Sequence, residues 1–259
     1  MKITQIRNAT LQVTYAGVRF LIDPMLAEQG AYPGLPGTVN SEIRNPTAPL
    51  PMTIAEILDV DVILLTHLHT DHWDAKAQEV VPKDRLLLVQ NEQDRQTLSE
   101  QGFSNIQIIE SGAEFRGIKL TTTECQHGYD ILFDNPAMAA RMGEVTGVIF
   151  SHPAEQTLYL VGDSIWTPAI EKTMKAEQPD VVILNAGWAH VFEYGPIIMG
   201  KEDILKTHLV LPHAKIVASH LEAMNHLLLT RAELQEYVQL NQIEAFVAIP
   251  ADGETIVYK

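Results

Sequence analysis

The sequence predicts an α/β fold in which sheets lie inside and helices outside, with residues 1–259 forming a single domain. Apolar runs too short for helices alternate along the chain with segments of helical period. No low-complexity segment or run of like charges divides the chain. The predicted buried strands are 61–66, 85–90, 157–162, 180–185, 215–219 and 245–249, and a β-branched stretch at 117–125 predicts one more.

The first elements are the two strands of a predicted β-hairpin at residues 11–22. Apolar and polar side chains alternate on both sides of the turn at 15–17, and this period of two is typical of a hairpin. Residues 28–51 follow, rich in glycine and proline and without any period. Such a segment predicts a long loop that covers a site, with a loose surface excursion as the alternative.

Helices are predicted between the later strands. Thr53 and Glu56 have the spacing of a capping box, which predicts that a helix begins there. Residues 92–102 form a second candidate, with Gly102 as its C-cap, and residues 230–240 form a third.

Composition and charge exclude several classes of protein. A hydrophobic content of 46% is that of a folded globular protein, and the formal net charge of -15 argues against nucleic-acid binding because it repels phosphate backbones. Cys125 is the one cysteine, so no intrachain disulfide can form, and we expect a small buried residue there. We see no secretory signal and no apolar run of membrane-spanning length, so we expect a cytoplasmic protein without membrane insertion.

Several predicted strands end in a polar side chain, and most of these side chains can bind a metal ion. The positions are His67, His127, Asp163, Asn185 and His220. Because the ends of neighbouring strands converge on one edge of a sheet, we expect these side chains to form a site.

The densest group of candidate ligands is the stretch HLHTDH, residues 67–72, which holds three histidines and an aspartate. Imidazole nitrogen and carboxylate oxygen together suit Zn²⁺, Mn²⁺ or Fe²⁺. On a continuing strand His67 and His69 would point the same way, and Asp71 and His72 follow so closely that the backbone must curl. Ligands at this density favour two neighbouring metal ions over one crowded tetrahedral site.

The stretch HLHTDH resembles the signature of the metallo-β-lactamase-fold hydrolases, and the later segments CQHG, LVGDS and VASHLE appear in the family's order. The resemblance covers nearly the whole chain and implies a four-layered αβ/βα sandwich. It also implies the roles of seven residues. A first metal ion would be held by His67, His69 and His127, a second by Asp71, His72 and His220, and Asp163 would bridge the two.

By this resemblance the reaction is metal-assisted hydrolysis. Two bound cations lower the pKa of water from about 16 toward about 7, so that a metal-bound hydroxide can attack an electrophilic carbon or phosphorus at neutral pH. Asp71 would be catalytic, orienting this nucleophile and shuttling its proton. Many true β-lactamases carry a cysteine at the second metal site, which has no counterpart here, so antibiotic hydrolysis is not expected.

Three further stretches narrow the resemblance. IRNATLQVTYAGVRFLIDP, VFEYGPIIMGKEDIL and SHLEAMNH are similar to the L-ascorbate-6-phosphate lactonase-like branch, which also includes relatives of N-acyl-phosphatidylethanolamine phospholipase D. We therefore expect a small anionic ester or lactone as substrate. The candidate substrate-facing parts are the loop 31–51, Arg44, Trp166, His190 and His226. His190 and His226 would contact substrate or support a ligand, and Arg44 would pair with an anionic group unless it is simply solvated.

Two other functions stay open at this point. One is a phosphodiesterase of the same fold, and the other is a metal-binding regulatory protein without turnover. We expect two divalent metal ions per chain, with zinc first and manganese or iron also compatible with the ligands. The expected partner is a small-molecule substrate, and a homo-oligomer is a fair default.

Overall fold

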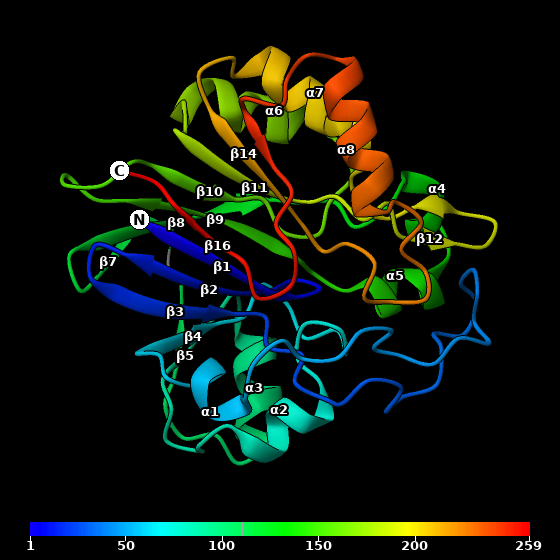
Figure 1. Ribbon diagram of the computed structural model, residues 1–259. Coiled ribbons are helices and arrows are strands. Elements are labelled where there is room, and N and C mark those ends of the chain that lie inside the picture. Colours follow the sequence, from blue (N-terminus) through cyan, green and yellow to red (C-terminus); the bar gives the residue numbers. More distant parts are fainter. Residues whose placement is uncertain (110) are drawn as a thin grey trace.

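The computed structural model describes residues 1–109 and 111–259. Within these residues two large sheets face each other, and a group of helices covers the outer face of each sheet (Figure 1). This layered α/β arrangement confirms the predicted fold class. No helix in the described ranges is both long enough and apolar enough to cross a membrane.

Each large sheet has seven strands in the described part of the chain. The strands of the first are β1 (Lys2–Arg7), β2 (Thr10–Tyr15), β3 (Val18–Ile22), β4 (Val62–Leu64), β5 (Leu87–Val89), β6 (Ile106–Ile108) and β16 (Thr255–Val257). The strands of the second are β7 (Ala113–Phe115), β8 (Ile118–Glu124), β9 (Thr146–Ser151), β10 (Leu158–Leu160), β11 (Val181–Asn185), β14 (Lys215–Ser219) and β15 (Val247–Ala248). Their orders are β16-β1-β2-β3-β4-β5-β6 and β15-β14-β11-β10-β9-β8-β7.

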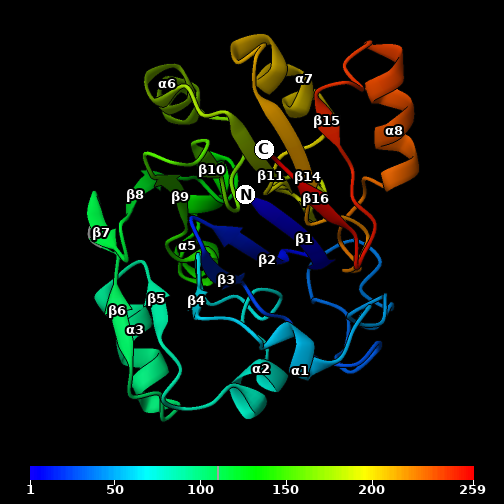
Figure 2. The same cartoon turned by 60° about the vertical axis from the view of Figure 1, so that its left-hand side comes forward.

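The remaining elements are helices and one small ribbon. The helices are α1 (Ile54–Ile57), α2 (Ala75–Val80), α3 (Glu92–Glu100), α4 (Asp130–Phe133), α5 (Pro136–Met142), α6 (Pro168–Glu177), α7 (Lys201–Val210) and α8 (Arg231–Leu240). The ribbon pairs β12 (His190–Val191) with β13 (Gly195–Pro196). Figure 2 shows α6, α7 and α8 on one side of the two sheets and α1 and α2 on the opposite side.

Local sequence explains where elements begin and end. Ala16 and Gly17 both have positive φ, 47° and 80°, which is the backbone of a tight two-residue turn, and the hairpin of β2 and β3 is confirmed. Thr53 and Glu56 form the predicted capping box of α1. The C-cap of α3 is the residue before Gly102, so that prediction was wrong by one position; Gly102 itself takes the left-handed φ of 89° that follows the cap.

The main core lies between the two sheets, where their inner faces interdigitate. Phe20 of the first sheet meets Phe150 of the second edge to face, with ring centroids 5.2 Å apart. Tyr15 is fully buried beside them and donates a hydrogen bond from its hydroxyl to the carbonyl of Phe150 at 2.9 Å. Separate apolar clusters join each sheet to its own helices, so every face of the sandwich is packed.

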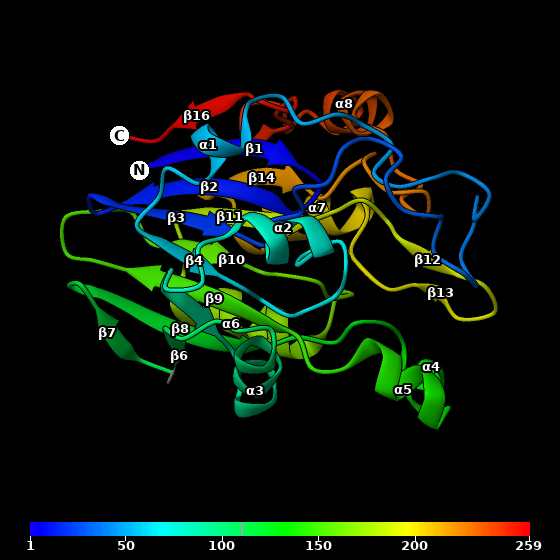
Figure 3. The ribbon, with the colours of Figure 1, turned by 90° about the horizontal axis from the view of Figure 1, so that it is seen from below.

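Strand direction places the functional residues at one end of the sandwich. β3 and β4 are parallel in the first sheet, and β10, β11 and β14 are parallel in the second. β8 is antiparallel to β9, which is antiparallel to β10, so β8 runs in the direction of β10. The carboxyl ends of these strands meet at the end where the loop 28–51, α4, α5 and the β12–β13 ribbon also lie (Figure 3). The predicted convergence of strand ends is confirmed.

Candidate metal centre

Seven side chains meet at this end of the sandwich. The loop after β4 supplies four of them, and the segments after β8, β10 and β14 supply one each. Three sets have ligand atoms that lie within 4.8 Å of one another: His67, His69 and His127; His67, His72 and Asp163; and Asp71, His72 and His220. The structure therefore brings together all seven residues that the sequence predicts as ligands.

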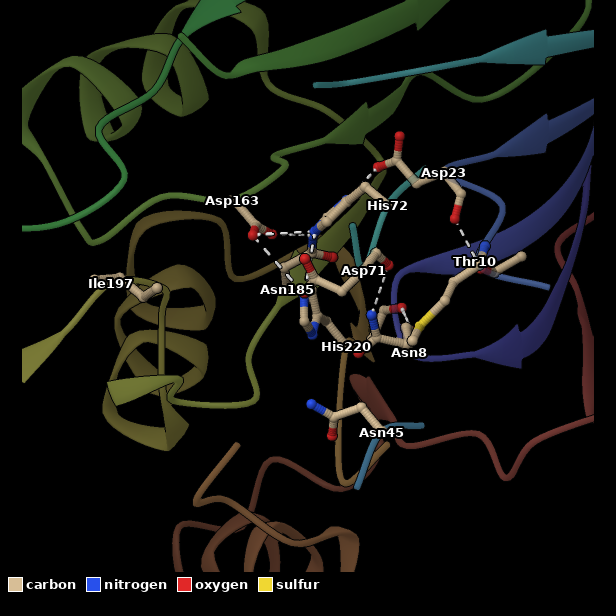
Figure 4. A network of polar contacts seen from close by, with 12 residues as sticks. Asn8, Thr10, Asp23, Asn45, Asp71, His72, Asp163, Asn185, Ile197 and His220 are labelled. Carbon is tan, nitrogen blue, oxygen red and sulfur yellow. Dashed lines mark hydrogen bonds and ion pairs between the residues drawn. The ribbon is translucent and has the colours of Figure 1, made fainter. Parts of the chain in front are cut away.

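Asp163 lies at the centre of this group. Its Oδ2 atom is within 4.0 Å of four histidine Nε2 atoms, at 3.1 Å from His72, 3.7 Å from His127, 3.7 Å from His220 and 4.0 Å from His67. Figure 4 shows this carboxylate facing His72 and His220. One oxygen surrounded in this way lies where several imidazole nitrogens could share a cation with it.

A buried carboxylate that the sequence analysis missed holds Nδ1 of His72 directly and Nδ1 of His67 through a threonine hydroxyl. Asp23, directly after β3, accepts a hydrogen bond from His72 Nδ1 at 2.9 Å (Figure 4). The hydroxyl of Thr66 donates to the same carboxylate at 2.6 Å and lies 3.1 Å from His67 Nδ1. Such contacts fix the tautomer and the ring orientation of metal-binding histidines.

Two other histidines are oriented by backbone carbonyls. His127 Nδ1 lies 2.9 Å from the carbonyl oxygen of Ile197, and His69 Nε2 lies 2.8 Å from that of Arg141. Arg141 is in the last turn of α5, where carbonyls have no partner within the helix. The end of α5 therefore positions His69 and leaves its Nδ1 atom free to bind a cation.

Amide side chains hold the carboxylate of Asp163 and the backbone of Asp71. Asn185, at the end of β11, donates to Oδ1 of Asp163 at 2.7 Å and leaves Oδ2 facing the histidines. Asn8, in the turn between β1 and β2, donates to the carbonyl of Asp71 at 2.9 Å (Figure 4). The carbonyl of Asn8 also accepts the backbone N–H of His220 at 3.0 Å. Asn8 thus joins one ligand segment of each sheet.

His220 has a left-handed backbone that its surroundings enforce. Its φ is 59°, an uncommon value for a residue with a side chain. Gly187 lies against it so closely that a Cβ atom at that position would be 2.0 Å from the His220 carbonyl oxygen. A glycine at 187 is therefore needed for His220 to reach the cluster.

The electrostatics of the cluster favour a bound cation. Burial lowers the pKa of His127 to about 4 and that of His67 well below its ordinary value, so both rings are neutral and able to bind metal. Burial alone would raise the pKa of Asp163 and Asp71, but neighbouring histidines outweigh it and keep both carboxylates ionised. His72 is buried too, yet the carboxylates around it raise its pKa, which marks a place where positive charge is stabilised.

Unpaired buried nitrogens supply a direct test of whether a metal ion fits here. The Nε2 atom of His67 and the Nδ1 atom of His220 are buried without a hydrogen-bond partner among the described residues. His72 Nε2 and His220 Nε2 are 3.2 Å apart, although both are donor atoms for a cation. A buried unpaired polar atom is costly, and a cation at the cluster would satisfy His67 Nε2. The donor set of nitrogen and carboxylate oxygen thus fits divalent metal ions.

A cavity of about 260 Å³ opens over the cluster. Its walls combine proposed ligands with apolar side chains from four segments. The lining residues are Leu35, Thr38, Leu68, His69, Thr70, Asp71, His127, Arg141, Met142, Asp163, Val191, Ile197 and His226. A cavity of this kind, mostly apolar with a few convergent polar groups, is the usual form of a small-molecule site.

Of the four side chains predicted to face substrate, His226 lines this cavity and the other three lie elsewhere. Arg44 is exposed and donates to the carbonyls of Gly30 and Ala31, within its own loop. Trp166 packs against the helices that cover the second sheet. His190 bonds through Nδ1 to a neighbouring backbone carbonyl in the β12 ribbon.

Several lining residues escaped the sequence analysis. Met142 and Arg141 come from α5, while Val191 and Ile197 come from the β12–β13 ribbon and its end. They lie between strands in segments without apolar periodicity, so only tertiary contacts reveal them. The loop 28–51 contributes as well, through two residues near its middle.

Comparisons with known proteins agree with this geometry. The family described as "Beta-lactamase superfamily domain" matches residues 18–221. The UPF0173 protein YddR of Bacillus subtilis (strain 168) is 42% identical over 259 residues, 100% of both chains. An isothiocyanate hydrolase from Delia radicum gut bacteria is 47% identical with a TM-score of 0.98, covering 100% of this chain and 99% of its own. A possible metal-dependent hydrolase from Veillonella parvula DSM 2008 is 40% identical with a TM-score of 0.97, covering 99% and 98%.

The two-sheet sandwich and its cluster of histidine and aspartate define the class: this is a metal-dependent hydrolase of the metallo-β-lactamase fold. Within the beta-lactamase superfamily, the chain belongs to the UPF0173 metal-dependent hydrolase family.

Proposed function

We propose that this protein hydrolyses a small molecule at a two-metal centre held by the seven side chains around Asp163. The observation that carries the proposal is the position of Asp163 Oδ2, within 4.0 Å of four histidine nitrogens and below a mostly apolar cavity. Divalent cations bound at such a site lower the pKa of water and polarise the electrophilic group of a substrate.

The residues of the chain supply the remaining parts of the reaction. Asp71 is ionised, lines the cavity and has Oδ2 3.3 Å from His220 Nε2, so it can orient the attacking water and accept its proton. Asp23 and Asn185 hold the rings and the shared carboxylate in fixed orientations. The apolar walls of the cavity exclude bulk water, which strengthens every polar interaction inside it.

The substrate that we propose first is a small isothiocyanate. The support is full-length similarity, at 47% identity, to a protein described as an isothiocyanate hydrolase, together with apolar walls that suit the hydrocarbon part of an organic substrate. Water would add to the central carbon of R–N=C=S, and the resulting thiocarbamate would break into R–NH₂ and COS. The atoms of one isothiocyanate and one water balance in these products.

A small anionic ester or lactone is the second candidate, and it would place the protein in the lactonase-like branch. The observation that favours it is Arg141, a guanidinium at the wall of the cavity. Hydrolysis of such a carbonyl group would use the same water and the same Asp71.

Metal content and a substrate panel test these proposals together. Protein purified without a histidine tag is analysed for metals by elemental mass spectrometry. It is then assayed with 2-phenylethyl isothiocyanate, a carboxylated γ-lactone and bis(p-nitrophenyl) phosphate, with His67→Ala as control. We expect about two metal ions per chain and turnover of the isothiocyanate or the lactone.

The other outcomes are equally informative. A single metal ion per chain would contradict the two-metal centre. Turnover of the diester alone would establish the phosphodiesterase alternative. Fully metal-loaded protein that turns over no substrate better than His67→Ala would favour a metal-binding regulatory protein.

We further propose zinc as the resident metal, since the donors are histidine nitrogen and carboxylate oxygen, with manganese and iron as alternatives. A single thiol without a possible intrachain partner supports a cytoplasmic location. A homo-oligomer remains our default proposal for the assembly.

A further inference from the structure

Arg141 is the one arginine of the described chain whose guanidinium has neither an ion pair nor a hydrogen bond to a described residue. Its only hydrogen bond is through the backbone carbonyl that holds His69. Each other arginine contacts a carboxylate or a carbonyl: Arg7, Arg19, Arg44, Arg85, Arg95, Arg116 and Arg231. The Arg141 side chain is exposed, and it lines the cavity in a chain with a net charge of -15.

The side chain of Arg141 extends toward the loop 28–51. A Cβ atom built on Gly37 would lie 3.7 Å from its Nη1 atom. The guanidinium is therefore close to the loop that supplies Leu35 and Thr38 to the same cavity.

A second polar group of the cavity also has an unused hydrogen-bonding position. His226 is 4% exposed and lines the cavity, and its Nδ1 atom is buried without a partner among the described residues. Unpaired buried polar atoms are rare in folded proteins, so the unused hydrogen-bonding position of His226 calls for an explanation. Arg141 and His226 are thus the two polar groups of the wall, apart from the threonines and the proposed metal ligands, that are available to a substrate.

We propose that Arg141, with His226 in the wall of the same cavity, binds a carboxylate on the far end of the substrate from the bond that is cut. This inference rests on the proposed function and specifies its substrate class as small molecules with an anionic end and an apolar spacer. A guanidinium pairs with a carboxylate through two parallel hydrogen bonds, which gives orientation as well as affinity. The anionic end at Arg141 and the electrophilic carbon at Asp163 would align the substrate along the cavity.

A matched pair of substrates tests the proposal. Pentyl isothiocyanate and 5-isothiocyanatopentanoate are similar in length and differ in charge. In metal-loaded wild type we expect the lower KM for the carboxylate. Arg141→Gln should raise that KM about tenfold or more, change kcat little, and leave the KM of the neutral substrate within about twofold. Arg141→Lys should raise the KM of the carboxylate substrate less than Arg141→Gln does, because lysine keeps the positive charge but lacks the planar guanidinium.

Two controls separate this role from a structural one. Arg95→Gln removes a surface guanidinium on α3, outside the cavity, and should leave both KM values unchanged. Metal content should be equal in all variants, since the Arg141 side chain does not hold His69. The proposal is overturned if Arg141→Gln affects both substrates equally or neither of them.

Binding without turnover distinguishes failure of this proposal from failure of the proposed function. Valerate is titrated calorimetrically into metal-loaded wild type and Arg141→Gln, with valeramide as the neutral probe. We expect valerate to bind wild type and to lose about tenfold in affinity in the variant. Equal valerate binding in both proteins would place the anion elsewhere and overturn the proposal. Absence of turnover with normal Arg141-dependent valerate binding would instead contradict the proposed reaction.

Discussion

At the scale of single residues, Asp163 has two oxygens with two different environments. Oδ1 accepts the amide hydrogen bond of Asn185 at 2.7 Å, whereas Oδ2 faces four imidazoles. The carboxylate cannot rotate without losing the first contact. The fixed orientation of Asp163 therefore keeps one oxygen facing histidine nitrogens from both sheets, where a cation could bind.

Asp163→Asn should lose metal and activity together. The amide removes the negative charge that faces the histidines, while its size is nearly the same. We expect less than half of the wild-type metal content and at least a 100-fold loss of turnover, measured by elemental mass spectrometry and kinetics. Asp84→Asn, an exposed carboxylate outside the cavity, is the control. Full metal content in Asp163→Asn would remove the shared carboxylate from the proposal.

Gly187→Ala should displace His220. The added Cβ would meet the His220 carbonyl at 2.0 Å, so the backbone must move. We expect weaker metal binding and a lower Tm. Gly17→Ala is the matched control, because Gly17 also has a constrained backbone, with φ of 80°, but nothing lies within 4 Å of its added Cβ. That variant should lose about 1 kcal/mol of stability through strain and keep its metal. Equal metal affinity in both variants would contradict the role of Gly187.

The Tyr15 hydroxyl should make stability depend on pH in alkaline solution. Burial raises its pKa to about 12, above the ordinary value of about 10. An acid with a raised pKa in the folded state stabilises that state fully below pH 10 and loses this contribution as pH rises toward 12. Relative to Tyr15→Phe, the free energy of unfolding of wild type should therefore fall by about 1.4 kcal/mol between pH 8 and pH 11. Urea unfolding of both proteins at pH 8 and pH 11 measures this difference. If the free energy of unfolding changed with pH in the same way in wild type and Tyr15→Phe, the pKa of the Tyr15 hydroxyl would not be raised by folding.

At the scale of elements, one buried asparagine makes four side-chain hydrogen bonds to the loop 28–51. The Asn225 side chain accepts hydrogen bonds from Leu35 N at 3.1 Å and Asn45 Nδ2 at 2.7 Å. It donates to Thr38 Oγ1 at 2.9 Å and to the carbonyl of Val39 at 2.7 Å. A glycine- and proline-rich loop without a core of its own gains a fixed shape from these four bonds.

Asn225→Ala should loosen the loop without removing metal. Each buried loop group left unpaired costs about 1–3 kcal/mol, so the segment should open more often. We expect faster limited proteolysis within residues 31–50 and a higher KM, at unchanged metal content. Asn241→Ala, which breaks one side-chain bond at the end of α8, is the control. Cleavage at the wild-type rate would show that other contacts hold the loop.

The sequence could predict those elements whose own residues have a recognisable local pattern. Buried strands such as β4 and β11 are short apolar runs, and the hairpin and the capping box have local signatures. β7 and β16 are three residues long and largely exposed, so their identity depends on pairing with distant strands.

The residues of the candidate site also differ in whether the sequence could predict them. The proposed ligands could be predicted because HLHTDH and the later strand ends are chemically unusual stretches. Asp23 and Asn8 could not, because an aspartate or an asparagine at a turn is common there for backbone reasons alone. Their roles depend on where β1 and β3 lie relative to β14 and β4, and only the folded sheets show that.

At the scale of the whole molecule, each sheet supplies part of the candidate metal centre. The first contributes the loop 67–72, and the second contributes residues 127, 163 and 220. A cation at the cluster would therefore link the two halves of the sandwich. Binding to the folded state alone stabilises it by an amount that grows with ligand concentration.

Removal of metal should therefore lower the Tm of the whole chain. At a metal concentration of about 100 times Kd the stabilisation is about 2.7 kcal/mol, which corresponds to about 5–10 °C for a chain of this size. Differential scanning calorimetry with and without chelator measures the shift, and added zinc should reverse it. Asp163→Asn should show little shift under either condition. An unchanged Tm in chelated wild type would mean that the sheets hold together without help from the cations.

The division of the proposed ligands between the sheets also has a consequence during protein synthesis. A nascent chain that has completed β1 to β6 carries the four groups of residues 67–72 but none of the other three. The last of them, His220, directly follows β14 of the second sheet. The proposed centre can therefore be complete only after β14 and His220 have been synthesised, and metal uptake would report that strands of both sheets have come together.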